Sequence, residues 1–322
     1  MIAVIAELAG GELNRATWEA LVAAQQLAAL TGGVPVRVLV PGNRAVAETL
    51  AGSGAGEVLL VDSPALEAYT PDAYTAALAD VIQSLDARFV MLAHTYQARD
   101  YVPALAARLD RPLIADVTRI AAGADGVTFS RPMFQGKLSA DVRPTGGSPC
   151  FVTVQIGAFR ADQLQKAAAA AVTARPVAIE AGTVRQVPEP PFREAQRAVD
   201  LSQAARIVAV GRGIKSKDQL PVAESLARAL GAELAASRPI CDSGWLPMER
   251  QIGSSGQTVA PRLYVALGIS GAIQHLVGMK GSRTIVAINK DADAPIFEVA
   301  DYGIVGDLFE IVPALVAELE KK

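Results

Sequence analysis

Short runs of Val, Ile, Leu and Ala alternate with longer stretches of helical apolar spacing in the first half of the chain. This alternation is typical of a parallel sheet covered by helices, because parallel strands are buried on both faces. The runs predict five strands, Ile2–Leu8, Pro35–Val40, Val58–Val61, Phe89–Ala93 and Leu113–Val117. The intervening stretches predict four helices, Arg15–Leu30, Arg44–Ala51, Pro71–Leu85 and Ala98–Leu109.

The pattern changes after Gly126, where turns alone separate three apolar runs, Val127–Arg131, Leu138–Val142 and Phe151–Gln155. Such short connections predict antiparallel strands. The stretch Val187–Ala204 holds three prolines followed by mixed charge, a composition that favours an interdomain linker. We therefore expect an amino-terminal domain at residues 1–187, a linker at 188–204 and a second domain at 205–322.

The second half predicts another parallel sheet, with strands at Arg206–Val210, Glu233–Ala236, Leu263–Leu267, Thr284–Ile288 and Tyr302–Val305. Ser216 and Gln219 have the spacing of a capping box at the start of a helix that ends at Gly231. A closing helix is predicted from Asp307, as N-cap, to Leu319. The fold class is thus α/β, with two lobes that each hold a mostly parallel sheet and flanking helices.

Small, hydrogen-bonding or basic residues follow every strand of the second lobe. They are Gly211-Arg212-Gly213, Ser237-Arg238, Gly268-Ile269-Ser270-Gly271, Asn289-Lys290-Asp291 and Gly306-Asp307. Ligands of open parallel sheets bind beyond the carboxyl ends of the strands. Glycines let backbone amides approach a pyrophosphate, and Ser270-Gly271 precedes a predicted helix, Ala272–Leu276. Together these strand ends predict the rim of a nucleotide site.

A nicotinamide dehydrogenase is a less favoured alternative. The first loop misses the GxGxxG pattern because Ser216 stands at its third glycine, and the second strand ends in Ser237-Arg238 instead of an acid. Arg238 would suit an NADP 2′-phosphate, which keeps that class open. Yet the chain has only two histidines, His94 and His275, and no Tyr-x-x-x-Lys set. Substrate chemistry is therefore poorly supported.

Composition narrows the picture further. Mean hydropathy is +0.28, but no apolar run approaches the roughly 20 residues that a membrane span needs. Met1 to Gly10 resembles neither a signal nor a transit peptide, so we expect a cytoplasmic protein. A net charge of −3 with mixed signs argues against nucleic acid. Cys150 and Cys241 lie far apart without metal spacing, and we expect buried or half-buried free thiols and no metal site.

Longer stretches carry a specific resemblance. Pro261–Lys280, Ile285–Phe297 and Val299–Val305 resemble the FAD-binding signature of electron transfer flavoprotein α subunits. Gly211-Arg212-Gly213 and Ser237-Arg238 stand at matching spacings, so the resemblance covers residues 206–319, whereas the first lobe matches more loosely. It implies a Rossmann-like FAD-binding second lobe and a first lobe that packs against a β subunit in a heterodimer.

The resemblance also implies an electron carrier rather than an enzyme. Electrons would come from flavoprotein dehydrogenases, as in fatty acid β-oxidation, and pass to a quinone reductase or similar acceptor, without membrane insertion. Three alternatives stay open: an electron-bifurcating form of the heterodimer, a stand-alone NADP- or FAD-dependent oxidoreductase, and a nucleotide-binding regulatory module.

Carried over residue by residue, the resemblance implies a set of FAD contacts. They are Arg212, Ser237, Arg238, Ile252, Gly253, Ser254, Ser255, Ser270, Gly271, Ala272, Ile273, Gln274, His275, Asn289, Asp307 and Leu308. Arg212, Ser237, Asn289, Asp307 and Leu308 are implied to contact the ribityl, pyrophosphate or adenosine portions. The segment from Ser270 would wrap the pyrophosphate.

Three of these residues are implied to lie at the flavin ring: His275 near O2, Arg238 over the ring, and Ser255 with its hydroxyl toward N5. From spacing alone, His275 could equally be a helix-surface residue, and Arg250–Gln257 a plain connecting loop. One departure is visible. Ser254-Ser255-Gly256-Gln257 stands where many relatives have Gln-Thr-Gly-Lys, which puts the flavin potential in question.

Overall fold

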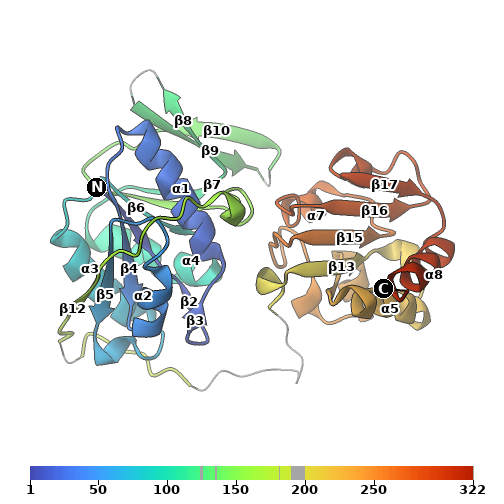
Figure 1. Ribbon diagram of the computed structural model, residues 1–322, viewed down its shortest axis with the longest axis horizontal. Coiled ribbons are helices and arrows are strands. Elements are labelled where there is room, and N and C mark those ends of the chain that lie inside the picture. Colours follow the sequence, from blue (N-terminus) through green and yellow to red (C-terminus); the bar gives the residue numbers. More distant parts are fainter. Residues whose placement is uncertain (124–125, 135, 181, 190–199, 322) are drawn as a thin grey trace. The chain divides into compact units, whose positions relative to one another are not determined.

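The computed structural model describes residues 1–123, 126–134, 136–180, 182–189 and 200–321. The chain divides into two compact units, Met1–Phe192 and Arg193–Lys322, each built around its own sheet (Figure 1). Most of the predicted linker, residues 190–199, lies outside the described residues. Within the described ranges, no helix combines the length and the apolar character needed to cross a membrane.

The first unit holds a seven-stranded parallel sheet in the order β12-β5-β4-β1-β6-β11-β7. Its strands are β1 (Ile2–Ile5), β4 (Val36–Pro41), β5 (Glu57–Asp62), β6 (Phe89–Ala93), β7 (Leu113–Val117), β11 (Cys150–Val154) and β12 (Val172–Pro176). Its helices are α1 (Ala16–Leu30), α2 (Arg44–Leu50), α3 (Pro71–Gln83) and α4 (Tyr96–Arg108).

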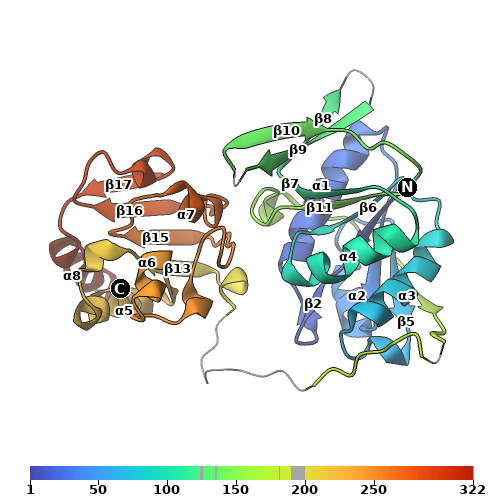
Figure 2. The same ribbon diagram turned by 180° about the vertical axis from the view of Figure 1, so that it is seen from behind.

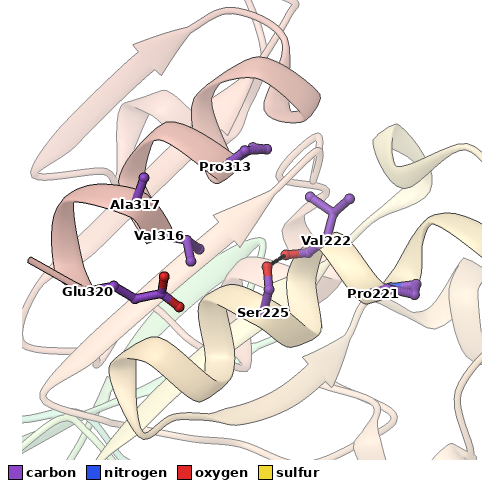
Figure 3. Close-up of a pocket in the computed structure, with 7 residues that line it drawn as sticks. All are labelled: Pro221, Val222, Ser225, Pro313, Val316, Ala317 and Glu320. Atoms are coloured by element: carbon purple, nitrogen blue, oxygen red, sulfur yellow. Dashed lines mark hydrogen bonds between the residues drawn. The ribbon is translucent and has the colours of Figure 1, made fainter.

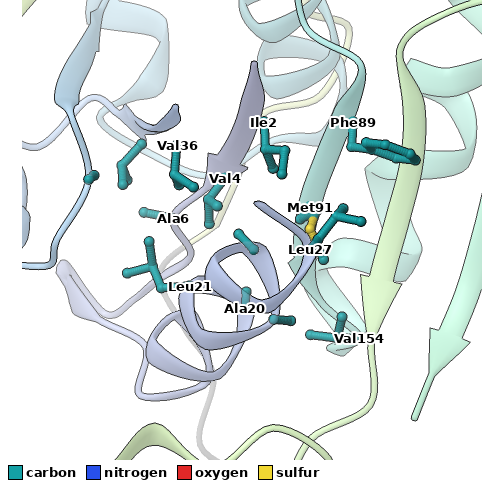
Figure 4. Packing of buried hydrophobic residues seen from close by; sticks show 14 of the residues in the cluster. Ile2, Val4, Ala6, Ala20, Leu21, Leu27, Val36, Phe89, Met91 and Val154 are labelled. Atoms are coloured by element: carbon teal, nitrogen blue, oxygen red, sulfur yellow. The ribbon is translucent and has the colours of Figure 1, made fainter. Parts of the chain in front are cut away.

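Helices cover both faces of this sheet, so its strands are apolar on both sides. Ile2 and Val4 of β1 pack toward α1 and α2, as Figure 4 shows for the α1 side, whereas Ala3 and Ile5 pack toward α3 and α4. Three of the helices begin where a side-chain oxygen accepts a hydrogen bond from a first-turn amide. The accepting residues are Asn43, Thr70 and Thr95.

Two predictions for the first unit were wrong, and two of its strands, β8 (Arg119–Gly123) and β12, were not predicted. The run after Gly147 forms β11, which lies parallel between β6 and β7 and is not antiparallel. The reason is that β9 (Gly126–Met133) and β10 (Leu138–Val142) form a separate antiparallel sheet with β8 (Arg119–Gly123), and the chain then returns to the main sheet. The predicted strand from Ile2 ends at Ile5, and a short hairpin of β2 (Leu8–Ala9) and β3 (Glu12–Leu13) follows.

The second unit is a five-stranded parallel sheet in the order β14-β13-β15-β16-β17. Its strands are β13 (Arg206–Val210), β14 (Glu233–Ala236), β15 (Leu263–Leu267), β16 (Ile285–Asn289) and β17 (Tyr302–Val305). Its helices are α5 (Leu220–Leu230), α6 (Arg238–Asp242), α7 (Ile273–Val277) and α8 (Leu308–Leu319). Counted along the chain, the strand order is 2-1-3-4-5, that of flavodoxin-like doubly wound sheets, with its switch point between β13 and β15.

Different elements cover the two faces of this sheet. Helices α5, α6 and α8 pack on one face, and α7 with the loop around Ile252 and Val259 packs on the other (Figure 2). Gly231 ends α5 in a left-handed conformation, as predicted. The predicted capping box does not form, because a short 3-10 turn (Lys217–Gln219) intervenes and α5 begins only at Leu220.

Candidate functional site

The loops that follow β13 and β15 meet at the switch point through their glycines. The amide of Gly213 donates to the Gly268 carbonyl oxygen over 3.0 Å. A Cβ on Gly213 would lie 2.6 Å from the Gly268 Cα, and Gly268 has a φ of +59°. Only two glycines allow this approach, since any side chain would strike backbone. The sequence therefore locks two strand-end loops together where open α/β sheets bind ligands.

A second glycine contact fixes the loop that follows the turn Met248–Arg250. A Cβ on Gly278 would lie 2.6 Å from the Gly253 Cα, and the Ser254 amide donates to the Gln274 carbonyl oxygen over 2.8 Å. The Ile252 amide donates to the Ala236 carbonyl oxygen, which places the loop beside the end of β14. The loop is thus not a plain connection: it joins the ends of β14 and the segment after β15.

His275 is buried, not on a helix surface. Its Nε2 lies 2.8 Å from the hydroxyl oxygen of Tyr264 on β15, and its Nδ1 lies 3.1 Å from the Ile252 carbonyl oxygen. A carbonyl only accepts, so Nδ1 carries the proton of the neutral ring and the Tyr264 hydroxyl donates to Nε2. Burial lowers the pKa of His275 to about 4, although the Ile252 carbonyl opposes the shift. The ring is neutral at physiological pH.

Gln251 and Ser255 form a polar pair at the same place. The Nε2 of Gln251 donates to the Ser255 hydroxyl oxygen over 3.0 Å, and Ser255 itself is exposed. The other amide atom, Oε1, is buried and has no hydrogen-bond partner in the part of the chain that the structure describes. Gln257 accepts from the Leu201 amide and donates to the Glu249 carbonyl, so it anchors the loop.

The ends of β16 and β17 complete the same edge of the sheet. The side-chain amide of Asn289 donates to the Ile269 carbonyl oxygen over 2.9 Å, which holds the segment after β15. Asp307 accepts from the Phe309 amide as N-cap of α8 and lies 2.7 Å from Lys290 Nζ. The Lys290 ammonium is the main cause that lowers the pKa of Asp307. Asn289 and Asp307 therefore shape the rim as well as lining it.

The remaining predicted contacts differ in what they offer a ligand. Arg212 and Arg238 are exposed, and the Arg238 Nε lies 3.3 Å from an Asp242 carboxylate oxygen. Ser237, which precedes α6, is buried. The side chains of Ile252 and Leu308 belong to the hydrophobic core. From those two residues only backbone groups remain for a ligand.

The segment before and into α7 presents a mixed face. Ser270, Ala272, Ile273 and Gln274 are exposed. Gly271 between them is buried with a φ of +87°, and a Cβ there would lie 2.7 Å from the Ile296 Cα. The segment is therefore pressed against the turn Pro295–Glu298 while its polar groups stay accessible.

Sequence reasoning missed Gln251 and Tyr264. Gln251 lies in a loop for which the sequence did not decide between a role in the site and a plain connection. Tyr264 lies in an apolar run predicted to be a strand. The available signal for Tyr264 was chemical, because a buried tyrosine hydroxyl needs a hydrogen-bond partner. Its partner, 11 residues away, could not be identified from spacing.

A surface pocket elsewhere in the unit does not belong to this edge (Figure 3). It lies between α5 and α8 and is lined by Pro221, Val222, Ser225, Pro313, Val316, Ala317 and Glu320. The Ser225 hydroxyl donates to the Val222 carbonyl of its own helix. With an acidic Glu320 and no cationic lining residue, the pocket is unsuited to a dinucleotide phosphate.

The carboxyl edge of the first unit's sheet has a different character. At its switch point, between β1 and β6, the Thr95 hydroxyl donates to Glu7, which also accepts from Asn14 Nδ2 over 2.7 Å. The acid is held by neutral groups of the same unit, which disfavours a phosphate there. Both cysteines are buried free thiols, as predicted, and burial raises the pKa of Cys150 to about 12. Across the described residues no cluster of three or more metal-ligating side chains occurs.

Comparison with known proteins identifies the family. Residues 2–180 match the electron transfer flavoprotein domain, and residues 200–280 match the electron transfer flavoprotein FAD-binding domain. The chain is 39% identical over 321 residues to the electron transfer flavoprotein subunit alpha of Bacillus subtilis (strain 168), covering 99% of this chain and 97% of that protein. The same identity holds over 319 residues with the subunit alpha of Paracoccus denitrificans, covering 99% of both chains.

A further relative has another name. The acryloyl-CoA reductase electron transfer subunit beta of Anaerotignum propionicum is 36% identical over 348 aligned positions, covering 99% of this chain and 95% of that protein. The chain belongs to the electron transfer flavoprotein family. Its expected FAD and its expected class, an electron-transfer protein instead of an enzyme, are confirmed at the level of the family.

The residues at the carboxyl edge of the second sheet fit FAD. Glycine-lined backbone and the cationic side chain of Arg212 suit a diphosphate, and the planar guanidinium of Arg238 suits an aromatic ring. The unpartnered Oε1 of Gln251 offers an acceptor, and Ser255 offers an exposed hydroxyl beside it. When bound, FAD supplies a ring that takes up and releases electrons one or two at a time.

Proposed function

We propose that this chain is the FAD-bearing subunit of a heterodimeric electron carrier, which takes electrons from flavoprotein dehydrogenases and passes them to a quinone reductase or similar acceptor. The observation that carries the proposal is the edge of the second sheet, where glycine contacts lock the loops after β13, β14 and β15 into one rim. Such a rim binds and orients a dinucleotide but brings no acid–base or nucleophilic set with it.

Different residues of the rim would contact different portions of the cofactor. Arg212, Ser237, Asn289 and Asp307, with the backbone of Leu308, would hold the ribityl, pyrophosphate and adenosine portions. The backbone of Gly271 and Gln274 with the hydroxyl of Ser270 would wrap the pyrophosphate. Ser255 would donate to the ring and Arg238 would lie against it. His275 would support the rim from the protein side without a side-chain hydrogen bond to FAD, because both of its ring nitrogens already have protein partners.

A partner subunit completes the proposal. Residues 1–187 would form the unit that packs against the β subunit, and residues 188–204 the linker to the FAD-binding unit at 205–322. Ser254, Ser255, Ile273 and Gln274 are exposed on this chain, which leaves part of the ring for the β subunit to cover. The relatives' names, which speak of subunits, support an obligate partner.

Purification of the chain with and without its β subunit tests this function. The heterodimer should be yellow with FAD in a one-to-one ratio, and it should accept electrons from a reduced acyl-CoA dehydrogenase but turn over no small substrate. The isolated chain should lose FAD during gel filtration. Full FAD occupancy in the isolated chain would refute the partner requirement, and turnover of a small substrate without a second protein would refute the carrier function.

A further inference from the structure

Gln251 is fixed from both its backbone and its neighbours. Its amide donates to the Met248 carbonyl oxygen over 3.0 Å, and its carbonyl accepts from the Gln257 amide over 2.8 Å. The side chain crosses the turn above Gly256, where an added Cβ would lie 3.0 Å from the Gln251 Cγ. Because its exposed fraction is 1%, the side chain has a single defined place.

The direction of the hydrogen bond between Gln251 and Ser255 has a chemical consequence. An amide nitrogen only donates, so Gln251 Nε2 occupies an acceptor position of the Ser255 hydroxyl oxygen. The serine proton then cannot point back toward Nε2. Since Ser255 is exposed, its O–H is left to donate outward, on the side where the rim is open.

The oxygen of the same side-chain amide, Oε1, indicates that Gln251 does more than stabilise the fold. Oε1 is buried without a partner among the described residues, and an unpaired buried acceptor destabilises the folded state. A leucine would fill the same space without that cost. A glutamine at this position makes sense where its amide serves the site.

We propose that Gln251 is a positioning residue for the cofactor, because its side-chain N–H fixes the Ser255 hydroxyl as an outward-pointing donor toward the flavin ring. The inference rests on the proposed function and deepens it. Gln251 acts through Ser255: without the amide, the hydroxyl rotates freely and its donation to the ring becomes one of several arrangements.

A double-mutant cycle on the FAD-loaded heterodimer tests this role. The first-electron potential is measured by spectroelectrochemical titration in wild type, Gln251→Leu, Ser255→Ala and the double variant. We expect Gln251→Leu to shift the potential in the same direction as Ser255→Ala and by at least half as much. In the Ser255→Ala background, Gln251→Leu should add no further shift. Equal shifts in both backgrounds, or none in either, would overturn the inference.

Gln257→Leu is the matched control, because it removes an amide from the same loop whose partners are Leu201 and Glu249. It should leave the potential unchanged while FAD stays bound. A shift as large as that of Gln251→Leu would show general loosening of the loop and overturn the positioning role. A colourless wild-type heterodimer would overturn both this inference and the proposed function, whereas a yellow one with additive shifts overturns the inference alone.

Discussion

The Tyr264 hydroxyl oxygen lies 2.8 Å from Nε2 of His275, and neither side chain is more than 6% exposed. Tyr264 comes from β15 and His275 from α7. The imidazole also contacts the carbonyl of Ile252, which lies in the loop Arg250–Gln257. One neutral ring therefore ties three segments of the rim together. Charging it would require a proton inside the core.

This burial makes the second unit sensitive to acid. The pKa of His275 is about 4 in the folded state, whereas an unfolded histidine titrates near its ordinary value of 6.5. As pH falls below 6.5, only the unfolded state takes up the proton, so stability is lost until pH reaches about 4. The loss amounts to about 1.4 kcal/mol per pH unit, or roughly 3 kcal/mol in total.

The measurement is denaturant unfolding of the chain at several pH values, followed by the fluorescence of Trp245. Trp18→Phe removes the only other tryptophan, so the signal reports the second unit. His275→Gln keeps a polar side chain that does not titrate and should flatten the profile between pH 4 and 6.5. An unchanged slope in that variant would assign the pH dependence to other groups.

The glycine contact at the switch point predicts a specific loss of stability. Gly268 and Gly244 have similar left-handed φ values, +59° and +67°, but only Gly268 faces backbone within contact distance. Gly244→Ala should cost about 1–2 kcal/mol for the conformation alone. Gly268→Ala should cost about 1–3 kcal/mol more, because its Cβ would lie 2.6 Å from the Gly213 Cα.

Denaturant unfolding of both variants checks this difference, and FAD retention by the heterodimer checks its consequence. We expect Gly244→Ala to keep its FAD and Gly268→Ala to lose it. Equal destabilisation by the two substitutions would mean that the loops after β13 and β15 do not need their close contact.

The sequence predicted best those elements whose signal is local. The strands Phe89–Ala93, Arg206–Val210 and Leu263–Leu267 have the predicted bounds, because each is a continuous buried apolar run apart from its first residue in the last two. The direction of β11 was predicted wrongly, since a short connection does not reveal that a separate sheet is inserted before it. Ser216 failed as a helix cap because an extra 3-10 turn displaced the helix start.

The candidate site shows the same division. Its glycine loops were predictable because the conformations they permit are properties of single residues. The hydrogen bonds from Tyr264 to His275 and from Gln251 to Ser255 were not predictable, because they depend on how α7 and the loop Arg250–Gln257 pack in space. The sequence placed His275 at the ring or on a surface, and the structure places it in the core beneath the rim.

Ser255 tests the hydroxyl that the family resemblance implies. A hydroxyl that donates to the flavin is worth about 0.5–1.5 kcal/mol, which corresponds to about 20–60 mV for one electron. We expect Ser255→Ala to shift the first-electron potential by that amount with FAD fully bound. Ser255→Thr keeps the hydroxyl and should stay close to wild type. If both variants titrated like wild type, the hydroxyl would have no contact with the ring.

Arg238 offers the largest electrostatic effect at the rim. A guanidinium carries a positive charge, and its plane can stack on a ring. A cation about 4 Å from a developing negative charge gives about 4 kcal/mol of gross attraction at an effective dielectric of 20, and desolvation returns much of it. The side chain is 65% exposed beside Asp242. As a surface pair alone, it would contribute under about 1 kcal/mol to stability and nothing to the potential.

Substitution separates these two roles of Arg238. If the guanidinium lies against the ring, Arg238→Ala should lower the first-electron potential by about 40–80 mV, equivalent to about 1–2 kcal/mol, with FAD largely retained. Arg238→Lys should recover part of the shift, because an ammonium keeps the charge but cannot stack. Asp242→Asn removes the partner carboxylate and frees the guanidinium, so it should not lower the potential. A wild-type potential in the FAD-loaded alanine variant would leave Arg238 as a surface ion pair with Asp242.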